Sequence, residues 1–484
     1  MTRSARPHIS WLIAWAGLAV AGGIMLSTLP MLRLHIWWLF IAGTLLFVGI
    51  RKSTLVSIAC FILAGLMIGM WRGGLEQIGL SQYEKFYDHT VAVQATVSDD
   101  VAYGPGGDQR LMLSGVSLNG VRVNGQIWIS SDSGQDIKRS DLVVLKGKLG
   151  SGFGSAAASM FHASIIKVTH PNPPDFGLQT RDWFAASIRA AIPEPESNLA
   201  SGYLVGQRSN LPADLDNELK ATGLTHAVVA SGYNLTILVS LARQLFAQTS
   251  KYLAALSATS MVVGFMLMSG LSPSMTRAGL VAGLTLAAWY YGRRLHPFVL
   301  LAIAAAATAL INPFYVWGDI GWYLSFTSFA GVIILSPLVQ HALWHGDKKP
   351  GFAVQILVDT MSAQLVTLPV MVFAFGHYAT YALIANLLVL PLIPITMLLI
   401  FIAGLCGLLA PAFAHTIGLP ATLVLHYMTT VIAHIADWPG AYGDLPVGFP
   451  ILVIGYAALI GLILILWRKT GHDFRAEPEL ITTS

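Results

Sequence analysis

Long apolar runs recur along this chain, and they constrain its fold more than any other feature. Hydrophobic residues make up 55% of the 484 residues, whereas charged residues make up only 11%. A soluble globular domain carries about a quarter charged residues. A run of about 17 to 25 apolar residues has the length of a helix that crosses a bilayer. The sequence therefore predicts an α-helical polytopic membrane protein.

About twelve such runs can be placed, and the basic residues between them indicate their orientation. Cytoplasmic loops carry an excess of lysine and arginine. The pairs Arg293/Arg294 and Lys348/Lys349 then fall on the cytoplasmic side, as do both termini, in the cytoplasmic (inner) membrane. A signal peptide is the alternative interpretation of residues 1–29, but the second run follows so closely that an anchor is favoured. The predicted spans are residues 10–29, 34–50, 54–71, 223–245, 252–271, 274–291, 297–312, 320–340, 354–375, 380–402, 413–436 and 448–467.

The segment between the third and fourth runs has a different pattern. Its apolar and polar side chains alternate, which is the period of half-buried strands. The Asn119-Gly120 step between two such strands predicts a tight hairpin. Five short strands favour a small closed barrel of the OB type outside the cytoplasm, and a generic extracytoplasmic β-domain is the alternative. The predicted strands cover residues 91–97, 111–118, 121–129, 142–149 and 164–168.

An OB barrel suggests that this segment binds nucleic acid. Such barrels hold single strands through a basic groove and stacking aromatic side chains. The basic and acidic residues of 72–182 nearly balance, so any attraction to phosphate must come from a local patch. An ordinary solvated face is the alternative. The candidate patch consists of Lys138, Arg139, Lys146, Lys148 and Trp128.

Changes in composition divide the chain into five predicted domains. A proline-rich linker at residues 170–174 ends the β segment, and Trp183, Phe184 and Ile188 then fall on one helical face that can lie along the membrane surface. Residues 380–412 contain prolines and form either one span or a re-entrant segment. The predicted domains are 1–71 with three transmembrane helices, the OB-like domain 72–175, an interfacial helix and linker at 176–200, a second transmembrane domain at 201–467 and a cytoplasmic tail at 468–484.

A polar cluster lies in residues 223–234, at the start of an apolar run. Its polar members are His226, Ser231, Tyr233 and Asn234. Polar groups at membrane depth cost desolvation energy unless they have partners or line a wet cavity, so this cluster indicates the inside of a helix bundle.

His226 and Ser231 also suggest a nucleophile with its base, as in a membrane-embedded serine hydrolase. Residues five apart on one helix point about 140° away from each other, so the pair needs a break at Gly232. No carboxylate next to them completes a triad.

The two cysteines lie in apolar runs and suggest neither a disulfide nor a metal site.

Arg277 is the best candidate for a positive group along a path for an anion through the membrane. The alternative is contact with lipid headgroups. Asp319 either caps the helix that follows it or braces Arg277, and Trp322 offers a stacking surface or belongs to an interfacial aromatic belt. Arg208 and Lys220, just outside the membrane domain, form an entrance funnel or contact headgroups.

Several separated motifs resemble the ComEC family of DNA-uptake channels. Their order and spacing match those of the family over nearly the whole chain, with three helices, an OB-like domain and then a competence-type membrane domain. The motifs are Leu204-Val205-Gly206-Gln207-Arg208, Gly223-Leu224-Thr225-His226, Ser231-Gly232, Pro273-Ser274, Arg277-Ala278, Gly292-Arg293, Asn312-Pro313, Asp319, Leu324-Ser325-Phe326, Pro369, Asn386 and Pro391.

The resemblance implies a channel that passes single-stranded DNA into the cytoplasm during natural transformation. It also implies a surface DNA receptor, a cytoplasmic ATP-driven translocase and single-strand-binding proteins as partners. The sequence contains neither the His/Asp cluster of the family's metallo-β-lactamase-like domain nor a phosphate-binding Gly-rich loop, so we expect a channel-only member without enzyme activity, metal or cofactor. Tyr233-Asn234 departs from the small apolar-His pair that is more common in the family. A secondary transporter of a smaller anionic solute is the alternative.

Overall fold

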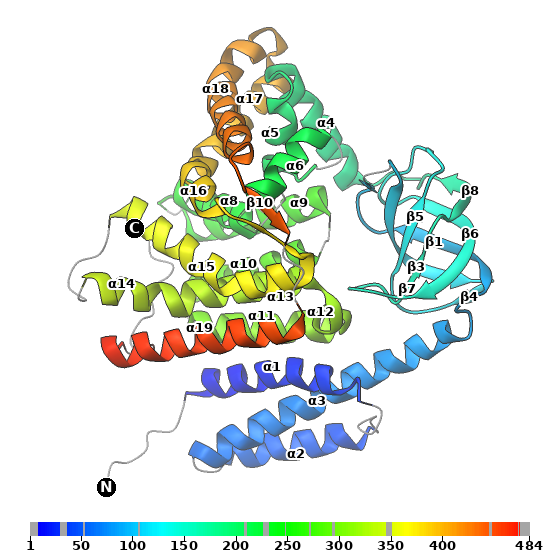
Figure 1. Ribbon diagram of the computed structural model, residues 1–484, viewed down its shortest axis with the longest axis vertical. Helices are drawn as coiled ribbons and strands as arrows, with labels where there is room; N and C mark the ends of the chain where they lie inside the picture. Colours follow the sequence, from blue (N-terminus) through cyan, green and yellow to red (C-terminus); the bar gives the residue numbers. More distant parts are fainter. Residues whose placement is uncertain are drawn as a thin grey trace. The chain divides into compact units, whose positions relative to one another are not determined.

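The computed structural model divides into two compact units, whose helices and strands are labelled in Figure 1. Unit 1 consists of Met1–Phe176, Gly270–Val281 and Phe298–Trp322, and unit 2 consists of Gly177–Ser269, Ala282–Pro297 and Tyr323–Ser484. The structure describes residues 8–29, 36–51, 54–104, 107–207, 211–225, 232–246, 248–270, 273–292, 296–344, 351–444, 448–472 and 474.

Most described residues are helical, which confirms the predicted fold class. Eight of the described helices are long and apolar enough to cross a bilayer, and two shorter apolar helices, Trp37–Arg51 and Pro297–Ile311, accompany them. The total of about twelve spans stays a prediction. The eight helices are Ile9–Leu26, Leu55–Glu84, Lys251–Ser269, Ile320–Trp344, Val354–Phe375, Ala382–Leu409, Pro411–Ala436 and Phe449–Thr470.

In unit 1, glycines bring two helices into backbone contact. Gly65, Gly69 and Gly73 recur every four residues on α3 and face α1. A Cβ at Gly69 would lie 2.1 Å from the carbonyl oxygen of Val20. Small residues at this spacing let membrane helices approach closely. The helices of unit 1 are α1 (Ile9–Leu26), α2 (Trp37–Arg51), α3 (Thr54–Glu84), the start of α10 (Pro273–Tyr290), α11 (Pro297–Ile311) and α12 (Phe314–Gly318).

Helix α3 continues beyond Trp71, where the sequence predicts the end of the third span, and ends at Glu84. Arg72 accounts for part of this extension. Its Nε donates to the carbonyl of Leu310 at 2.8 Å, and its Nη1 lies 2.7 Å from Glu76 one turn further along α3. The side chain thus caps the end of α11, where backbone carbonyls lack helical donors.

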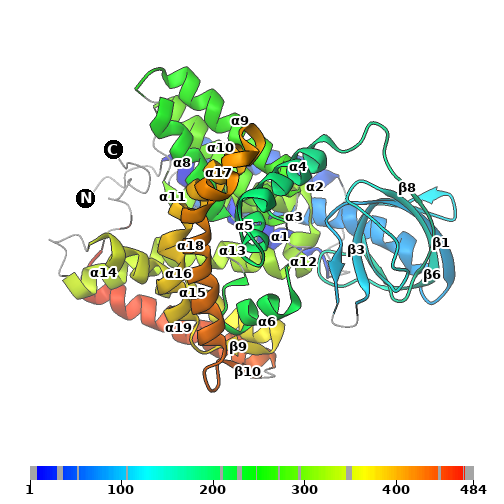
Figure 2. The same ribbon diagram turned by 90° about the horizontal axis from the view of Figure 1, so that it is seen from above.

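A closed five-stranded barrel follows α3 in unit 1. Strands β1, β3, β5, β7 and β6 pair in this order, and β6 pairs back with β1, so that the strands form a ring (Figure 2). Among the described strands, only β5 and β7 run parallel. This is the predicted OB-like domain. Its strands are β1 (Thr90–Val97), β2 (Ala102–Tyr103), β3 (Gln109–Leu118), β4 (Val121–Arg122), β5 (Ile127–Ser131), β6 (Leu142–Ser151), β7 (Ala158–Met160) and β8 (Ser164–Thr169).

The alternating pattern of the sequence defines the barrel core. Val93, Leu113 and Leu145 are fully buried, whereas their neighbours along each strand face outward. Asn119 and Gly120 both have positive φ and join β3 to β4 through a two-residue turn, as the sequence predicts.

Unit 2 is built mainly from helices, and several of them pack around one apolar core. Its elements are most of α4 (Phe176–Ala191), α5 (Glu196–Val205), α6 (Ala213–Ala221), α8 (Gly232–Phe246), α9 (Lys251–Ser269), the end of α10, most of α13 (Ile320–Ala330), the π-helix η2 (Gly331–Leu335), α14 (Ser336–Trp344), α15 (Phe352–Phe375), α16 (Ala382–Val389), the 3₁₀ turn η3 (Leu390–Leu392), α17 (Ile393–Leu409), α18 (Pro411–Ala436) and α19 (Phe449–Thr470), with strands β9 (His377–Ala379) and β10 (Tyr442–Asp444).

The predicted interfacial segment at 176–200 contains helix α4 and the start of α5, and one face of α4 packs onto other helices of unit 2. The rings of Phe184 and Phe401 lie 6.2 Å apart, and a Cβ at Gly418 would lie 2.3 Å from the carbonyl oxygen of Ala191. Trp183 remains 62% exposed, so it points away from this contact. Further along the chain, the prolines near residue 392 divide the predicted 380–402 span into α16, η3 and α17.

Candidate functional site

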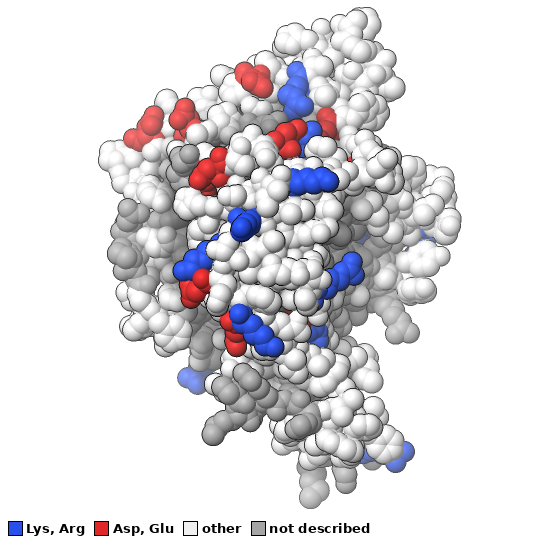
Figure 3. All heavy atoms as spheres, turned by 90° about the vertical axis from the view of Figure 1, so that its right-hand side faces the viewer, with Lys and Arg blue, Asp and Glu red and all other residues white. Residues whose placement is uncertain are grey.

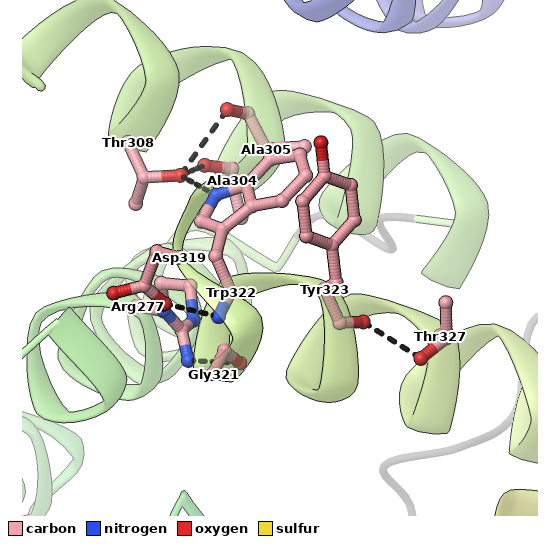
Figure 4. Close-up of polar contacts among 9 residues, drawn as sticks. All are labelled: Arg277, Ala304, Ala305, Thr308, Asp319, Gly321, Trp322, Tyr323 and Thr327. Carbon is pink, nitrogen blue, oxygen red and sulfur yellow. Dashed lines mark hydrogen bonds and ion pairs between the residues drawn. The ribbon is translucent and has the colours of Figure 1, made fainter. Parts of the chain in front are cut away.

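Arg277 lies near the start of α10 and is only 3% exposed (Figure 4). Its Nη2 donates to the carbonyl oxygen of Gly321 at 2.7 Å. Nη1 lies 3.8 Å from Oδ1 of Asp319, which is too long for a hydrogen bond but close enough to offset charge. Nε and Nη1 have no hydrogen-bond partner among the described residues. The guanidinium therefore keeps donor capacity within a nearly buried site.

The local sequence of the α12–α13 segment positions Asp319. Asn312 Oδ1 accepts from the backbone N–H of Phe314 at the start of α12, and Asp319 lies between α12 and α13. The carboxylate of Asp319 accepts a hydrogen bond from the backbone N–H of Trp322, so it caps α13. Both roles considered for Asp319 in the sequence therefore occur together, since the same oxygen faces Arg277.

Trp322 is anchored on α11. Its Nε1 donates to Oγ1 of Thr308 at 3.1 Å, and this hydroxyl donates to the carbonyl of Ala304 at 2.8 Å (Figure 4). The indole is 7% exposed, so it does not present an open stacking face in this conformation. Arg277, Asp319 and Trp322, which are separated in sequence, thus form one polar cluster in unit 1, which we call the Arg277 cluster.

The barrel touches the segment that carries this cluster. A Cβ at Gly318, next to Asp319, would lie 2.7 Å from the carbonyl oxygen of Gly154 in the β6–β7 loop. Trp317 donates its indole N–H to the carbonyl of Ile24 in α1 at 2.9 Å. The residues just before Asp319 are therefore held in place by two contacts. One is the backbone contact with the barrel, and the other is the hydrogen bond from Trp317 to α1.

The predicted polar cluster of residues 223–234 is described only in part. Asn234 is fully buried, and its Nδ2 donates to the carbonyl of Tyr203 at 3.1 Å, which ties α8 to α5. The backbone of Tyr233 belongs to α8. His226 and Ser231 lie outside the described residues, as does Arg208 of the predicted entrance.

The predicted basic patch on the barrel is made of residues with unlike surroundings. Arg139 is only 6% exposed, and its Nε lies 3.2 Å from Asp175. Lys148 is exposed and lies 2.9 Å from Asp88, and its hydrogen bond lowers the pKa of that carboxyl. Lys146 on β6 lies opposite Ala92 of β1 and Ser164 of β8 on the two neighbouring strands. Its side chain is exposed.

Lys138 and Lys220 also have acidic neighbours. Lys138 Nζ lies 3.6 Å from Asp136, and Lys220 Nζ lies 2.5 Å from Asp216 one turn before it. Basic and acidic side chains are interspersed on the side of the molecule drawn in Figure 3. The basic residues therefore do not form a field of one sign there.

Trp128 belongs to an exposed aromatic cluster that includes two residues absent from the sequence prediction. Its ring lies 5.1 Å from that of Phe153 and 5.2 Å from that of Phe161. The two phenylalanines are 50% and 58% exposed. They follow β6 and β7 in loops, and a soluble domain rarely exposes neighbouring aromatic side chains without a use for them. The sequence gives one signal for these two phenylalanines, which is that each is an aromatic residue within a loop rich in glycine and other small residues.

Within the described part of the chain, no group of three or more His, Cys, Asp or Glu side chains is placed to hold a metal ion. The described cysteines, Cys60 and Cys406, are not disulfide-bonded. What the Arg277 cluster offers chemically is therefore positive charge and hydrogen-bond donors, and the aromatic cluster offers stacking surface.

Together these features define a class, a multi-pass membrane protein with an inserted OB-like barrel. Comparison with known proteins places it further. The family model described as "Competence protein" matches residues 203–470. Because this match covers more than half of the chain, the protein belongs to the competence protein family, as the motifs of the sequence predict.

One curated relative is ComE operon protein 3 of Bacillus subtilis (strain 168). It is 21% identical to this chain over 263 residues. The aligned part covers 54% of this chain and 33% of the relative, so the chain matches about a third of that protein's length. No solved structure matches the chain.

Proposed function

We propose that this protein passes single-stranded DNA through the cytoplasmic membrane into the cell during natural transformation. Three observations support the proposal. The chain belongs to the competence family, its described helices include eight that can span a bilayer, and an OB-like barrel is inserted before the family domain. Small barrels of this type commonly bind single strands.

The Arg277 cluster is the observation that carries the proposal. A DNA strand brings one negative charge per nucleotide into a low-dielectric region, and such a path needs positive or polar groups. Arg277 is nearly buried, yet Nε and Nη1 are not engaged in hydrogen bonds to described residues. A phosphate oxygen that reached this guanidinium would find two donors available. Passage then requires the contact between Arg277 and Gly321 to open.

The aromatic cluster of the barrel suits the first contact with DNA. Trp128, Phe153 and Phe161 offer faces on which bases can stack in any sequence. Arg110 lies on the neighbouring strand β3, two residues from Met112, which is the cross-strand partner of Trp128. This places a basic side chain near the stacking surface.

In this proposal a surface DNA receptor delivers the strand, and a cytoplasmic ATP-driven translocase and single-strand-binding proteins receive it.

Substitution of Arg277 tests the proposal. We expect Arg277→Ala to reduce DNA entry into the cytoplasm at least tenfold, because a loss of about 1.4 kcal/mol in charge stabilisation corresponds to this factor. Surface binding of DNA should not change. Arg277→Lys should retain part of the activity, since a point charge remains while the planar fork is lost. The measurement is uptake of labelled DNA, with surface-bound and internal DNA separated by nuclease treatment.

The control is equal amount and folding of each variant in the membrane, measured by immunoblot and gel filtration in detergent. Normal DNA entry in a well-folded Arg277→Ala variant would rule out Arg277 as part of the path. Normal transformation in cells that lack the chain would refute the proposed function altogether.

Broken helices favour one alternative, a secondary transporter of a smaller anionic solute. The described part of the chain contains the π-helix η2 and the 3₁₀ turn η3 within candidate spans. Discontinuous helices hold substrates in many transporters. Transport of a small anion by the purified protein in liposomes, together with unchanged DNA uptake in its absence, would support this alternative.

A further inference from the structure

An acidic side chain lies inside a membrane span of unit 2. Helix α15 includes the candidate span Val354–Phe375, and Asp359 is its only charged residue. An ionisable group within a span is costly and is usually retained for proton or ion movement. No motif or periodic pattern in the sequence singles out Asp359.

Asp359 is bound by a hydroxyl group instead of a cation. Ser336 Oγ donates to Asp359 Oδ1 at 2.5 Å, and Gln340 Nε2 donates to the same hydroxyl at 3.0 Å. No basic side chain lies within ion-pair distance of Asp359 among the described residues. The ionised carboxylate therefore lacks a compensating charge there, and protonation would relieve its desolvation cost.

A π-helix places Ser336 against Asp359. Pro337 has no N–H to donate into the preceding turn, and the chain widens there into η2, in which Ser336 N–H donates to the carbonyl of Gly331. Gly331 packs against the backbone of α15, where a Cβ would lie 2.6 Å from the carbonyl oxygen of Ser362. This backbone contact brings a short hydroxyl side chain within reach of the carboxylate.

Among the described residues, the elements packed against α15 carry few titratable groups, and none of them forms an ion pair with Asp359. Helices α14, α15 and α19 lie side by side (Figures 1 and 2), and contacts pair the start of α19 with the end of α15. Tyr456 on α19 donates to the carbonyl of Val366, about two turns from Asp359. The helix η2 and α16 carry no titratable residue. The remaining groups are His341 on α14, Arg468 and Lys469 at the exposed end of α19, and His377 and Tyr378 on β9 beyond the far end of α15.

We propose that Asp359, together with Ser336 and Gln340, forms a proton-binding site within the membrane. The carboxylate takes up one proton and becomes a neutral acid, and it releases the same proton on the return step. A sodium ion would need about six oxygen ligands, as hard cations of its size do. The described surroundings provide the carboxylate and one hydroxyl, and Gln340 points a donor at that hydroxyl.

Two histidines extend this site toward one end of the bundle. His341 lies on α14, one residue beyond Gln340, and its ring lies 4.3 Å from that of His472, which follows α19. Imidazole is the side chain that most readily exchanges protons near neutral pH. In this proposal the two rings accept a proton that Asp359 releases.

Labelling with dicyclohexylcarbodiimide tests the site without reference to DNA. This apolar reagent modifies protonated carboxyl groups that it meets within a membrane. With the purified full-length protein in liposomes, we expect mass spectrometry to find the adduct on the peptide that carries Asp359, with a yield that falls as the pH rises. Asp136, whose side chain is 80% exposed on the barrel, serves as the unlabelled reference in the same digest.

The labelling results decide the proposal. Asp359→Asn should lose the adduct on this peptide completely, whereas Ser336→Ala should keep it because the acid remains. A yield that does not change with pH, no adduct at any pH, or protection by sodium ions at fixed pH would overturn the proton site. None of these outcomes depends on whether the protein carries DNA.

A second experiment connects the site to transport and rests on the proposed function. Asp359→Asn is nearly isosteric and still accepts a hydrogen bond from Ser336, so it should reach the membrane in normal amount. We expect it to lower DNA entry at least tenfold without change in surface binding, and Asp359→Glu to retain part of the entry. Entry at the normal level in Asp359→Asn would overturn a role of the proton site in transport, even where Arg277→Ala abolishes entry.

Discussion

Gly318 is a residue at which the segment that carries Asp319 packs against the backbone of the barrel. We expect Gly318→Ala to destabilise the protein by about 1–3 kcal/mol, the usual cost of forcing an added methyl group into a packed contact. The methyl group would lie 2.7 Å from the backbone oxygen of Gly154, and a backbone atom cannot rotate away. The measurement is thermal unfolding of the purified protein in detergent.

Gly461→Ala is the matched control for this substitution. A Cβ at Gly461 meets no atom within 4 Å, so this change should leave the unfolding temperature the same or slightly higher. Equal unfolding temperatures for both variants would mean that the contact between Gly154 and Gly318 does not form.

His162 provides a pH-dependent charge beside the aromatic cluster. Its Nδ1 lies 2.9 Å from Asp132, and the hydrogen bond to this carboxylate raises the pKa of His162. We expect Asp132→Asn to lower the pKa of His162 toward its ordinary value of about 6.5. The measurement is NMR titration of the protein with ¹³C-labelled histidine, in which no change of midpoint would disprove the pairing.

The sign of this pair's contribution to stability follows from the direction of the shift. Because the pKa of His162 is raised in the folded protein, the pair stabilises the fold at acidic pH, where His162 is charged in both states. The contribution disappears as the pH rises through the folded pKa. Both side chains are exposed, so water and salt weaken the interaction.

The residues of the Arg277 cluster could be chosen from the sequence, and so could the two roles of Asp319, but the other contacts could not. A lone arginine in an apolar run and an aspartate before a helix are visible locally. The bond from Arg277 to the carbonyl of Gly321 depends on where two segments meet in space. Arg139 shows the same limit. The sequence predicts that Arg139 belongs to a surface patch. In the structure its side chain is buried and pairs with Asp175, which is distant in sequence.

At the level of elements, alternation predicts strands well where each strand has one buried face. The predicted strands at residues 91–97, 111–118, 142–149 and 164–168 all lie within observed strands. Strand β7, Ala158–Met160, was missed because all three of its residues are buried and it therefore has no alternation. Yet β7 joins β5 to β6 and so contributes to the closure of the barrel.

The π-helix η2 was also missing from the sequence interpretation. Its residues read as a continuous apolar span, and the widened turn depends on backbone hydrogen bonds that the hydropathy pattern does not report. The sequence gives no role to Asp359 either, because that role depends on a contact between two helices. A single acid in an apolar run gains meaning only when the hydroxyl of Ser336, on another helix, is found beside it.

The aromatic cluster of the barrel gives a prediction for a surface element. We expect Trp128→Ala to weaken binding of single-stranded DNA by about 1–3 kcal/mol, the usual contribution of one stacked base. Tyr103→Ala is the control, because Tyr103 is an exposed aromatic residue of the same domain in β2. Fluorescence anisotropy of labelled oligonucleotides with the purified protein measures both. Equal losses in the two variants would argue against a specific stacking surface.

At the scale of the whole molecule, the orientation predicted from basic loops can be tested directly. We expect a cysteine placed at the exposed Asp136 of the barrel to react with an impermeant maleimide in spheroplasts, and one placed at Lys348 to react only after the membrane is opened. The control background replaces Cys60 and Cys406 by serine. Reaction of position 348 in sealed spheroplasts would reverse the predicted topology.

The glycine contact between α1 and α3 has a consequence for how the protein is made. These two helices precede the barrel in the chain, and the seam formed by Gly65, Gly69 and Gly73 needs no residue that is synthesised after it. Helix pairs of this kind associate within the bilayer once both are inserted. The pair can therefore form while the barrel is still being translated, so that α3 is already anchored when the barrel strands that follow it begin to pair.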